Sequence, residues 1–235
     1  MRLDIYLTKQ HGIQSRNKAQ ELIKAKKVLV DDKIITKSSF KVEDQHNITI
    51  DQEYFYVSRA AYKLKHFIDD NDIDIKNKIA LDIGSSTGGF TQILLENEIQ
   101  EVTCVDVGSN QLHDIIKNDK RIIVKENTDI RVFSSDTKYD IVTCDVSFIS
   151  ILNIIEDIHR LASDKIIILY KPQFEVGKEC KRDNNGVVLD QKAIEKVRSE
   201  FLDKTVQLGW NLLISQNSKL AGKSGNVEEL FYFNL

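Results

Sequence analysis

The sequence predicts an α/β protein: a Rossmann-like, mostly parallel sheet that follows a small N-terminal α/β domain. Strand-like and helix-like segments alternate from Lys78 to the end of the chain, as in doubly wound folds. The strand-like segments are nearly continuous apolar runs such as "IIILY", which is typical of strands buried on both faces. A glycine-rich stretch, "LDIGSSTGGFTQ" (81–92), leaves the first of these strands and enters a helix, where such sheets bind ligands.

The N-terminal domain is predicted to span residues 1–50. Helical spacing covers "RLDIYLTKQHG" and "SRNKAQELIKAKKVLV", and Ser15 is suited to cap the second helix. "VLVDDKIIT" indicates two short strands around the turn Asp31-Asp32-Lys33, and "HNITI" a closing strand. Residues 51–60 are predicted to be a linker, with Tyr54, Phe55 and Tyr56 packed between the two units. Ser58 is expected to cap a helix that begins near Arg59.

The second domain is predicted to span residues 61–235. Its expected strands are "KIALDIGSS", "EVTCVDVG", "RIIVKENTD", "YDIVTCDVSF", "KIIILYKPQFE", "WNLLISQNS" and "NVEELFYFNL". Its expected helices after the lead-in helix are "GGFTQILLENE", "NQLHDIIKND", "ISILNIIEDIHRLA" and "LDQKAIEKVRSEFLDKTVQLG". No helix separates the last two strands, so the final strand is expected to pair antiparallel, at or near an edge of the sheet.

Composition limits the class of protein. The N-terminus lacks the apolar stretch of a signal peptide, and the longest apolar runs are far shorter than the roughly 20 residues of a membrane helix. The cysteines Cys104, Cys144 and Cys180 are far apart, which argues against a zinc site or a disulfide framework. Cys104 and Cys144 lie in apolar runs and are predicted to be buried. We therefore expect a soluble, cytoplasmic protein that holds no metal.

Charge is distributed unevenly along the chain. Residues 1–65 carry a net charge of +5 and residues 66–235 a net charge of −8, which together give the overall −3. This asymmetry favours a basic partner-binding module attached to a more acidic body.

The glycine-rich loop indicates a nucleoside-type cofactor. A P-loop would need a lysine after Gly88-Gly89, and the spacing Gly84-Ser-Ser-Thr-Gly88-Gly89 is not the GxGxxG of a dinucleotide fold. Asp106, at the end of the second strand, is suited to bind a ribose diol. A site with an acid for the ribose but no phosphate-binding motif fits S-adenosylmethionine. The glycine-rich loop, its position and the final antiparallel strand together resemble a class I methyltransferase. A structural turn and NAD binding remain the alternatives.

The first 50 residues resemble an S4-type RNA-binding domain. The matching pieces are Arg2-Leu-Asp, Ser15-Arg16 and "LIKAKKVLVDDK". Members of that family usually carry glycine where this chain has Lys26 or Lys27, and Asn-Gly where it has Asp31-Asp32. The resemblance implies RNA binding by the basic residues Arg2, Arg16, Lys18, Lys24, Lys26 and Lys27, to which we add Arg59.

The whole chain resembles the TlyA family of rRNA 2′-O-ribose methyltransferases, which pair an S4 domain with an FtsJ-type catalytic domain. "VSRAAYKL", "LDIGSSTGGFT", "CDVSFIS", "LYKPQFE" and "GNVEE" occur in that order. The resemblance implies a catalytic tetrad of Lys63, Asp145, Lys171 and Glu228, with Glu229 as the alternative fourth member. The expected cofactor-binding residues are Asp82, Gly84, Ser85, Gly88, Gly89, Phe90, Asp106, Asp129 and Asp145. Asp129 stands where many relatives carry Asn, and either side chain can bind an adenine amine.

This tetrad suits transfer of a methyl group to a ribose 2′-hydroxyl. The hydroxyl needs a base as it attacks, and a lysine can serve when burial or a nearby cation makes it less basic. Lys171 is the expected base, Lys63 the expected cation, and the two acids are expected to orient the lysines.

The family implies a cytidine in ribosomal RNA as target and the ribosomal subunit as partner. The chain resembles the shorter form of the family, which implies large-subunit rRNA. We expect no membrane partner and favour a monomer. A pore-forming (haemolytic) protein and a non-catalytic rRNA-binding assembly factor are the alternatives.

Overall fold

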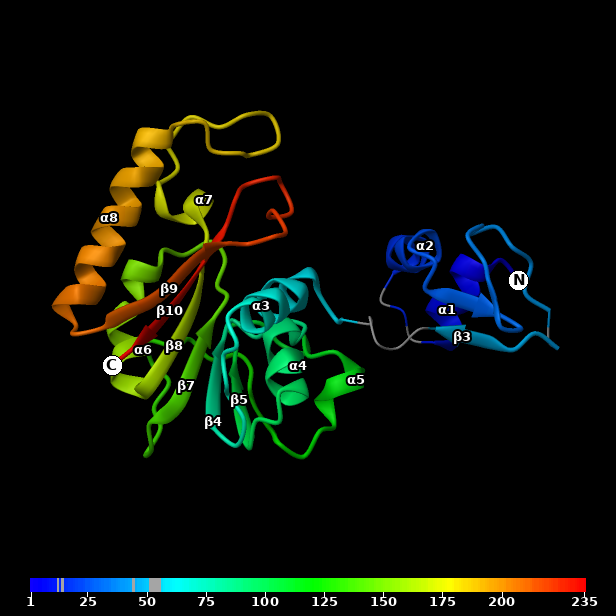
Figure 1. The fold of residues 1–235 in the computed structure, drawn as a ribbon, viewed down its shortest axis with the longest axis horizontal. Coiled ribbons are helices and arrows are strands. Elements are labelled where there is room, and N and C mark those ends of the chain that lie inside the picture. The colour runs from blue at the N-terminus through cyan, green and yellow to red at the C-terminus, as the bar shows by residue number, and fades with distance from the viewer. Residues whose placement is uncertain (12, 14, 44, 51–55) are drawn as a thin grey trace. The chain divides into compact units, whose positions relative to one another are not determined.

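The computed structural model describes residues 1–11, 13, 15–43, 45–50 and 56–235, and the chain divides into two compact units, Met1–Phe55 and Tyr56–Leu235 (Figure 1). The expected packing of Tyr54 and Phe55 lies outside the described residues. Tyr56 and Val57 are buried, and the Val57 N–H donates a hydrogen bond to Gln92 Oε1 (2.9 Å). These two residues of the predicted linker therefore belong to the second unit.

The first unit packs two helices against a small antiparallel sheet. The helices are α1 (Leu3–Gln10) and α2 (Arg16–Lys24), and the strands are β1 (Val28–Val30), β2 (Lys33–Ile34) and β3 (Ile48–Ile50), in the order β2-β1-β3. Ser15 caps α2 as predicted, because its hydroxyl accepts a hydrogen bond from the Lys18 N–H (3.2 Å). Apolar residues from both helices and from β1 and β3 form one buried cluster.

The predicted hairpin is present, although it lacks the usual glycine. Val30 pairs with Lys33, so the turn consists of Asp31 and Asp32, with φ values of 50° and 62°. Two left-handed residues are what a two-residue turn of type I′ requires. Lys26, at the other position where S4 domains usually carry glycine, also has a positive φ of 63°. Positions at which the resemblance implies glycine thus have left-handed backbone here, although their side chains make it less favourable.

The second unit is built on a seven-stranded sheet. The strands are β4 (Ile79–Ile83), β5 (Glu101–Val105), β6 (Ile122–Lys125), β7 (Tyr139–Cys144), β8 (Ala162–Tyr170), β9 (Asn211–Asn217) and β10 (Glu229–Asn234), and their order is β6-β5-β4-β7-β8-β10-β9. The strands from β6 to β8 are parallel, and β10 is antiparallel to both of its neighbours, as predicted. The order reverses direction between β4 and β7, which places a ligand-binding crevice at the carboxyl ends of these strands.

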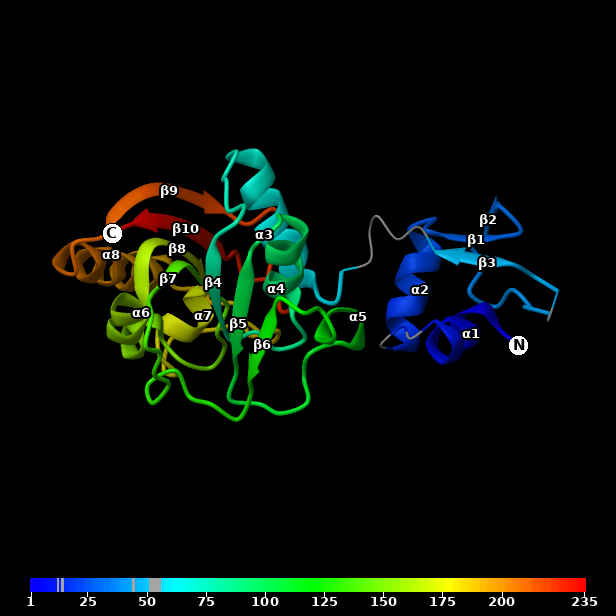
Figure 2. The same ribbon diagram turned by 90° about the horizontal axis from the view of Figure 1, so that it is seen from below.

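Helices cover both faces of this sheet (Figures 1 and 2). The helices α3 (Arg59–Asp70), α4 (Gly89–Glu96) and α5 (Asp114–Lys117) pack on one face, and α6 (Ile155–Leu161) and α8 (Gln191–Gln207) on the other. Cys104 and Cys144 are buried in the two opposite layers, as predicted, and burial raises the pKa of both thiols. Among the described residues, no helix is both long and apolar enough to cross a membrane.

Several predicted boundaries were wrong; for example, the strands expected to run to Asp129 and Phe148 end at Lys125 and Cys144. "PQFE" does not continue β8 but forms a short helix, α7 (Pro172–Glu175), because proline has no N–H for a sheet and its fixed φ suits the first helical position. The segment that starts at Ile149 divides into a 3₁₀ turn, Ile151–Asn153, and α6. The helix expected over "NQLHDIIKND" is reduced to α5. Ser58 precedes α3 as predicted, but its side chain makes no capping hydrogen bond.

Candidate active site

The glycine-rich loop lies at the carboxyl edge of the sheet, beside a cavity of about 380 Å³. This volume falls in the range of roughly 300–1,000 Å³ that is usual for small-molecule sites. The lining comes chiefly from the loops that follow β4, β5, β6 and β7. It consists of Ile83, Gly84, Ser86, Val105, Asp106, Val107, Gln111, Thr128, Asp129, Ile130, Asp145, Val146, Ser147, Phe148, Ile149 and Ile154.

Gly84 allows the loops after β4 and β7 to approach each other. Its φ is +76°, and a Cβ atom there would lie 2.8 Å from the main-chain oxygen of Asp145. Gly88 and Gly89 also serve the packing of α4. A Cβ on Gly88 would meet Ile116 of α5, and one on Gly89 would meet Ser58 beside α3. These two glycines therefore permit close packing of α4, and Gly88 lines neither this cavity nor its smaller neighbour.

Asp106 and Asp129 both reach the cavity, as the sequence predicts. The Asp106 carboxylate accepts hydrogen bonds from the main-chain N–H groups of Ser86 (2.8 Å) and Gly108 (2.7 Å), so it also fixes the loop after β4. Asp129 is ion-paired with Arg131 (2.6 Å), and the hydrogen bonds from Arg131 lower the pKa of Asp129 to about 2. Both carboxylates are thus held in place before any ligand binds.

A smaller cavity of about 120 Å³ shares Gly84, Ser86 and Asp145 with the first. Ser85, Gly89 and Phe90 also line it, and the buried hydroxyl of Ser85 has no hydrogen-bond partner among the described residues. Such an unpaired buried group calls for a ligand or water. The predicted cofactor residues other than Asp82 and Gly88 therefore surround two connected cavities.

The charge of the main cavity favours a cation over a phosphate. Three carboxylates line it, Asp106, Asp129 and Asp145, and no Lys or Arg is among its lining residues in the described part of the chain. Arg131 and Lys171 offset two of these charges by pairing with Asp129 and Asp145, so the described lining offers a pyrophosphate no free cation, and the Asp106 carboxylate remains to attract a sulfonium. The unpaired Ser85 hydroxyl and the carboxylate suited to a ribose complete a set of residues that fits S-adenosylmethionine.

Asp82 lies behind the loop rather than in the cavities. Its carboxylate is fully buried and accepts hydrogen bonds from the hydroxyls of Thr91 (2.6 Å) and Thr143 (2.8 Å). Burial raises the pKa of Asp82 to about 6. Since it lines neither cavity, Asp82 is placed to tie α4 and β7 to the end of β4, and its predicted contact with the cofactor has no support in this geometry.

The four residues of the predicted tetrad form two ion pairs. Lys63 is paired with Glu228, and both side chains are buried. Lys171 Nζ lies 2.5 Å from Asp145 Oδ1 and donates a hydrogen bond to Ser147 Oγ (3.1 Å). Within the part of the chain that the structure describes, Asp145 Oδ1 accepts no well-aligned hydrogen bond, so charge and proximity hold this second pair. Each buried lysine is therefore matched by a carboxylate, and Asp145 links its pair to both cavities.

The structure separates the two neighbouring acids Glu228 and Glu229. Glu228 faces Lys63, whereas Glu229 forms a two-pronged ion pair with Arg198 of α8, with both contacts at 2.7 Å. A second residue, Gln173, donates a hydrogen bond from Nε2 to Glu228 Oε1 (2.8 Å). Glu228 is thus the acid that completes the tetrad geometry.

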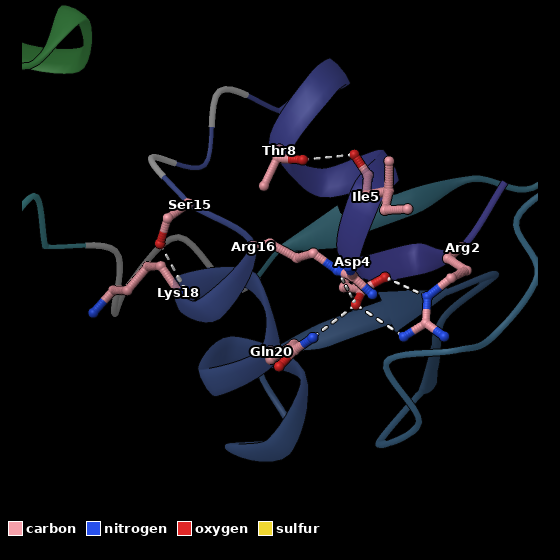
Figure 3. A network of polar contacts seen from close by, with 8 residues as sticks. All are labelled: Arg2, Asp4, Ile5, Thr8, Ser15, Arg16, Lys18 and Gln20. Carbon is pink, nitrogen blue, oxygen red and sulfur yellow. Dashed lines mark hydrogen bonds and ion pairs between the residues drawn. The ribbon is translucent and has the colours of Figure 1, made fainter.

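The basic residues of the first unit differ in their surroundings (Figure 3). Arg2 and Arg16 both bind Asp4, and Lys18 lies 3.6 Å from Glu21. Lys24 and Lys26 are exposed, and Lys27 is half-buried. Arg59 belongs to the second unit, where it donates a hydrogen bond to the main-chain oxygen of Ala221 (3.1 Å).

Comparison with known proteins agrees with this architecture. Residues 1–48 match the S4 domain, and residues 56–235 match the FtsJ-like methyltransferase family. The 23S rRNA (cytidine-2′-O)-methyltransferase TlyA of Campylobacter jejuni is 47% identical over 252 residues, which cover 99% of each chain. The chain belongs to the TlyA family. Two other TlyA-family relatives are the 16S/23S rRNA (cytidine-2′-O)-methyltransferase TlyA of Mycobacterium tuberculosis (36% identical; 97% of this chain, 87% of the relative) and Hemolysin A of Brachyspira hyodysenteriae (35% identical; 99% of each).

Some residues of this TlyA-family site were missed from the sequence. Gln173 and Ser147 contact the tetrad, and Thr143 and Thr91 hold Asp82. Gln173 follows Lys171 by two positions within "YKPQFE", so the motif contained it. The expectation that this segment was a strand obscured which side chains face the site, because the turn into α7 changes their directions.

Proposed function

We propose that this chain transfers a methyl group from S-adenosylmethionine to the 2′-hydroxyl of a cytidine in 23S rRNA. The observation that carries the proposal is the pair of buried ion pairs, Lys63–Glu228 and Lys171–Asp145, of which the second borders the predicted cofactor cavity. The name and full-length similarity of the Campylobacter relative support the choice of substrate.

Different residues of the chain are placed to bind different parts of the cofactor. Asp106 would bind the ribose, while Asp145 lines both cavities and Ser85 lines the smaller one. The bound cofactor supplies a methyl group that its sulfonium has already activated. The protein must therefore align the acceptor oxygen with that methyl and remove the hydroxyl proton.

Lys171 is the group placed to take that proton at Nζ. As the C–O bond forms and the C–S bond breaks, the proton of the 2′-hydroxyl passes to Lys171 Nζ, which must be neutral at that moment. Asp145 pairs with Lys171 and also lines the cofactor cavity, which places the expected base next to the methyl donor's site. Lys63 and Glu228 keep a fixed charge pair at the site.

The first unit supports RNA as the substrate. Its arginines and lysines give the N-terminal region a net positive charge, whereas the catalytic unit is acidic. Contacts of such residues with phosphates position an RNA without reading its sequence.

Analysis of modified nucleosides tests the proposal. Unmethylated 23S and 16S rRNA, each within its ribosomal subunit, are incubated with the protein and S-adenosylmethionine that carries a labelled methyl group. The rRNA is then digested and its nucleosides are separated by mass. Label in 2′-O-methylcytidine from 23S rRNA is the expected result. Label in a methylated base, or cofactor binding without any transfer, would contradict the proposal.

A further inference from the structure

Asp4 is a fully buried carboxylate in the first turn of α1, next to the exposed side chains of two arginines (Figure 3). Arg2 donates from Nε and Nη2 to its two oxygens (3.0 Å each), and Arg16 donates from Nε (2.8 Å). Gln20 adds a bond from Nε2 (2.8 Å). The hydrogen bonds from Arg2 hold the pKa of Asp4 well below its usual range, so the carboxylate is charged at neutral pH.

The two guanidinium groups are bound on one side only. The side chains of Arg2 and Arg16 are 42% and 53% exposed, while that of Asp4 is not exposed. Within the residues that the structure describes, Arg16 uses only Nε for Asp4 and has no other side-chain partner. Its terminal Nη groups therefore remain available to an acceptor from outside the chain.

A buried carboxylate next to an RNA-binding surface lowers the affinity for RNA unless another effect compensates. Its negative charge repels a polyanion and lowers the affinity for RNA phosphates. The compensating benefit is order, because a free arginine side chain loses rotamer entropy when it binds a phosphate. An arginine already fixed by a carboxylate loses less on binding.

We propose that Asp4 is a positioning residue of the RNA-binding unit, which fixes Arg2 and Arg16 so that their outward N–H groups bind backbone phosphate of the rRNA. Planar guanidinium groups suit this role because their paired donors match phosphate oxygens. The inference rests on the proposed function, in which rRNA is the substrate.

The variant Asp4→Asn is decisive because two roles for Asp4 predict opposite changes in RNA affinity: repulsion of RNA by its charge, and positioning of the arginines. If only charge mattered, removal of one negative charge would tighten RNA binding. If Asp4 positions the arginines, Asp4→Asn weakens binding by about tenfold, the loss expected for one charge-assisted hydrogen bond. Glu21→Gln is the matched control, since Glu21 is exposed on α2 and contacts neither arginine. It should bind as tightly as the wild type or more tightly.

The measurement is the fluorescence anisotropy of a labelled 23S rRNA transcript titrated with the full chain at moderate salt. The fold of each variant is checked by circular dichroism. A second variant, Arg16→Lys, keeps both the charge and Asp4 but lacks the guanidinium fork, and we expect it to lose about tenfold as well. In an Arg2→Ala/Arg16→Ala background, Asp4→Asn should no longer weaken binding, because only the effect of its charge remains.

Tighter or unchanged binding by folded Asp4→Asn would overturn the inference. If Asp4→Asn does not fold, wild-type affinity of Arg16→Lys would overturn it equally. Failure of the proposed function is distinguishable from either outcome, because the wild-type protein itself would then produce no 2′-O-methylcytidine.

Discussion

Lys63 and Glu228 form a buried ion pair although 165 positions separate them in the chain. Lys63 comes from α3, which precedes the sheet, and Glu228 immediately precedes the last strand, β10. The antiparallel pairing of β10 with β8 brings Glu229 opposite Tyr170, the residue before Lys171. The topology of the sheet thus carries both ion pairs to its carboxyl edge.

Substitution of the two neighbouring acids should separate their roles. Glu228→Gln leaves Lys63 without its counter-charge in a buried site, and we expect methyl transfer to fall by about 100-fold through misplaced groups. Glu229→Gln disturbs only the pair with Arg198 and should keep near-normal turnover. Single-turnover rates with saturating cofactor measure both effects, and calorimetry should show unchanged cofactor affinity. Equal losses in the two variants would contradict the assignment of Glu228.

Lys171→Arg should be inactive although it keeps the positive charge. The guanidinium does not give up its proton at working pH, so it cannot accept the proton of the 2′-hydroxyl. Loss of a general base lowers rates by about 10²–10⁴-fold. Cofactor binding and the melting temperature should remain close to those of the wild type. Robust turnover by this variant would mean that Lys171 supplies charge and not a base.

Asp106→Ala should weaken binding of S-adenosylmethionine by about 10- to 100-fold. The substitution removes the carboxylate placed for the ribose and also releases the N–H groups of Ser86 and Gly108. Asp119→Ala is the control, because Asp119 pairs with Arg121 and does not line the cavity. Isothermal titration with each folded variant makes the comparison. Wild-type affinity of Asp106→Ala would remove Asp106 from the site.

Asp82 should make the stability of the protein depend on pH. Its pKa is raised from 3.8 to about 6 by burial, so the folded state binds the proton more tightly than the unfolded state between these values. Asp82 therefore costs stability as the pH rises through this window, by up to roughly 3 kcal/mol above it. Asp82→Asn should be more stable than the wild type at pH 8, with a smaller advantage near pH 4. Urea unfolding at both pH values tests this; an advantage independent of pH would contradict it.

Much of this architecture could be predicted from the sequence because its signals are local. The buried strands are apolar runs, and each is followed by a turn signal. Asp106 and Asp145 occur directly after such strands, so their place at the carboxyl edge follows from the topology. The resemblance to the TlyA family then predicted that Lys63 and an acid near the C-terminus belong to one tetrad, and the structure shows that they pair.

What could not be predicted depends on contacts between distant segments. The three glycines of one loop look equivalent in sequence, yet only Gly84 approaches the loop after β7, whereas Gly88 packs against α5. In the sequence, Asp82 has the position of a ligand-binding residue at the end of a strand. The structure shows that the hydroxyl of Thr143, from another strand, donates a hydrogen bond to it. Arg2 and Arg16 were both expected to bind RNA, but nothing local showed that a single carboxylate, Asp4, holds them together.

The central claim is that the chain methylates a ribose hydroxyl of rRNA with Lys171 as the base. Alkaline cleavage mapping tests it most directly, because a 2′-O-methylated nucleotide resists cleavage at its own position. Unmethylated ribosomal subunits are treated with cofactor and either the wild-type protein or Lys171→Ala, and every position of both rRNAs is compared. We predict protection at a cytidine of 23S rRNA with the wild type and none with Lys171→Ala. Equal protection with both proteins, or none with either, would contradict the account.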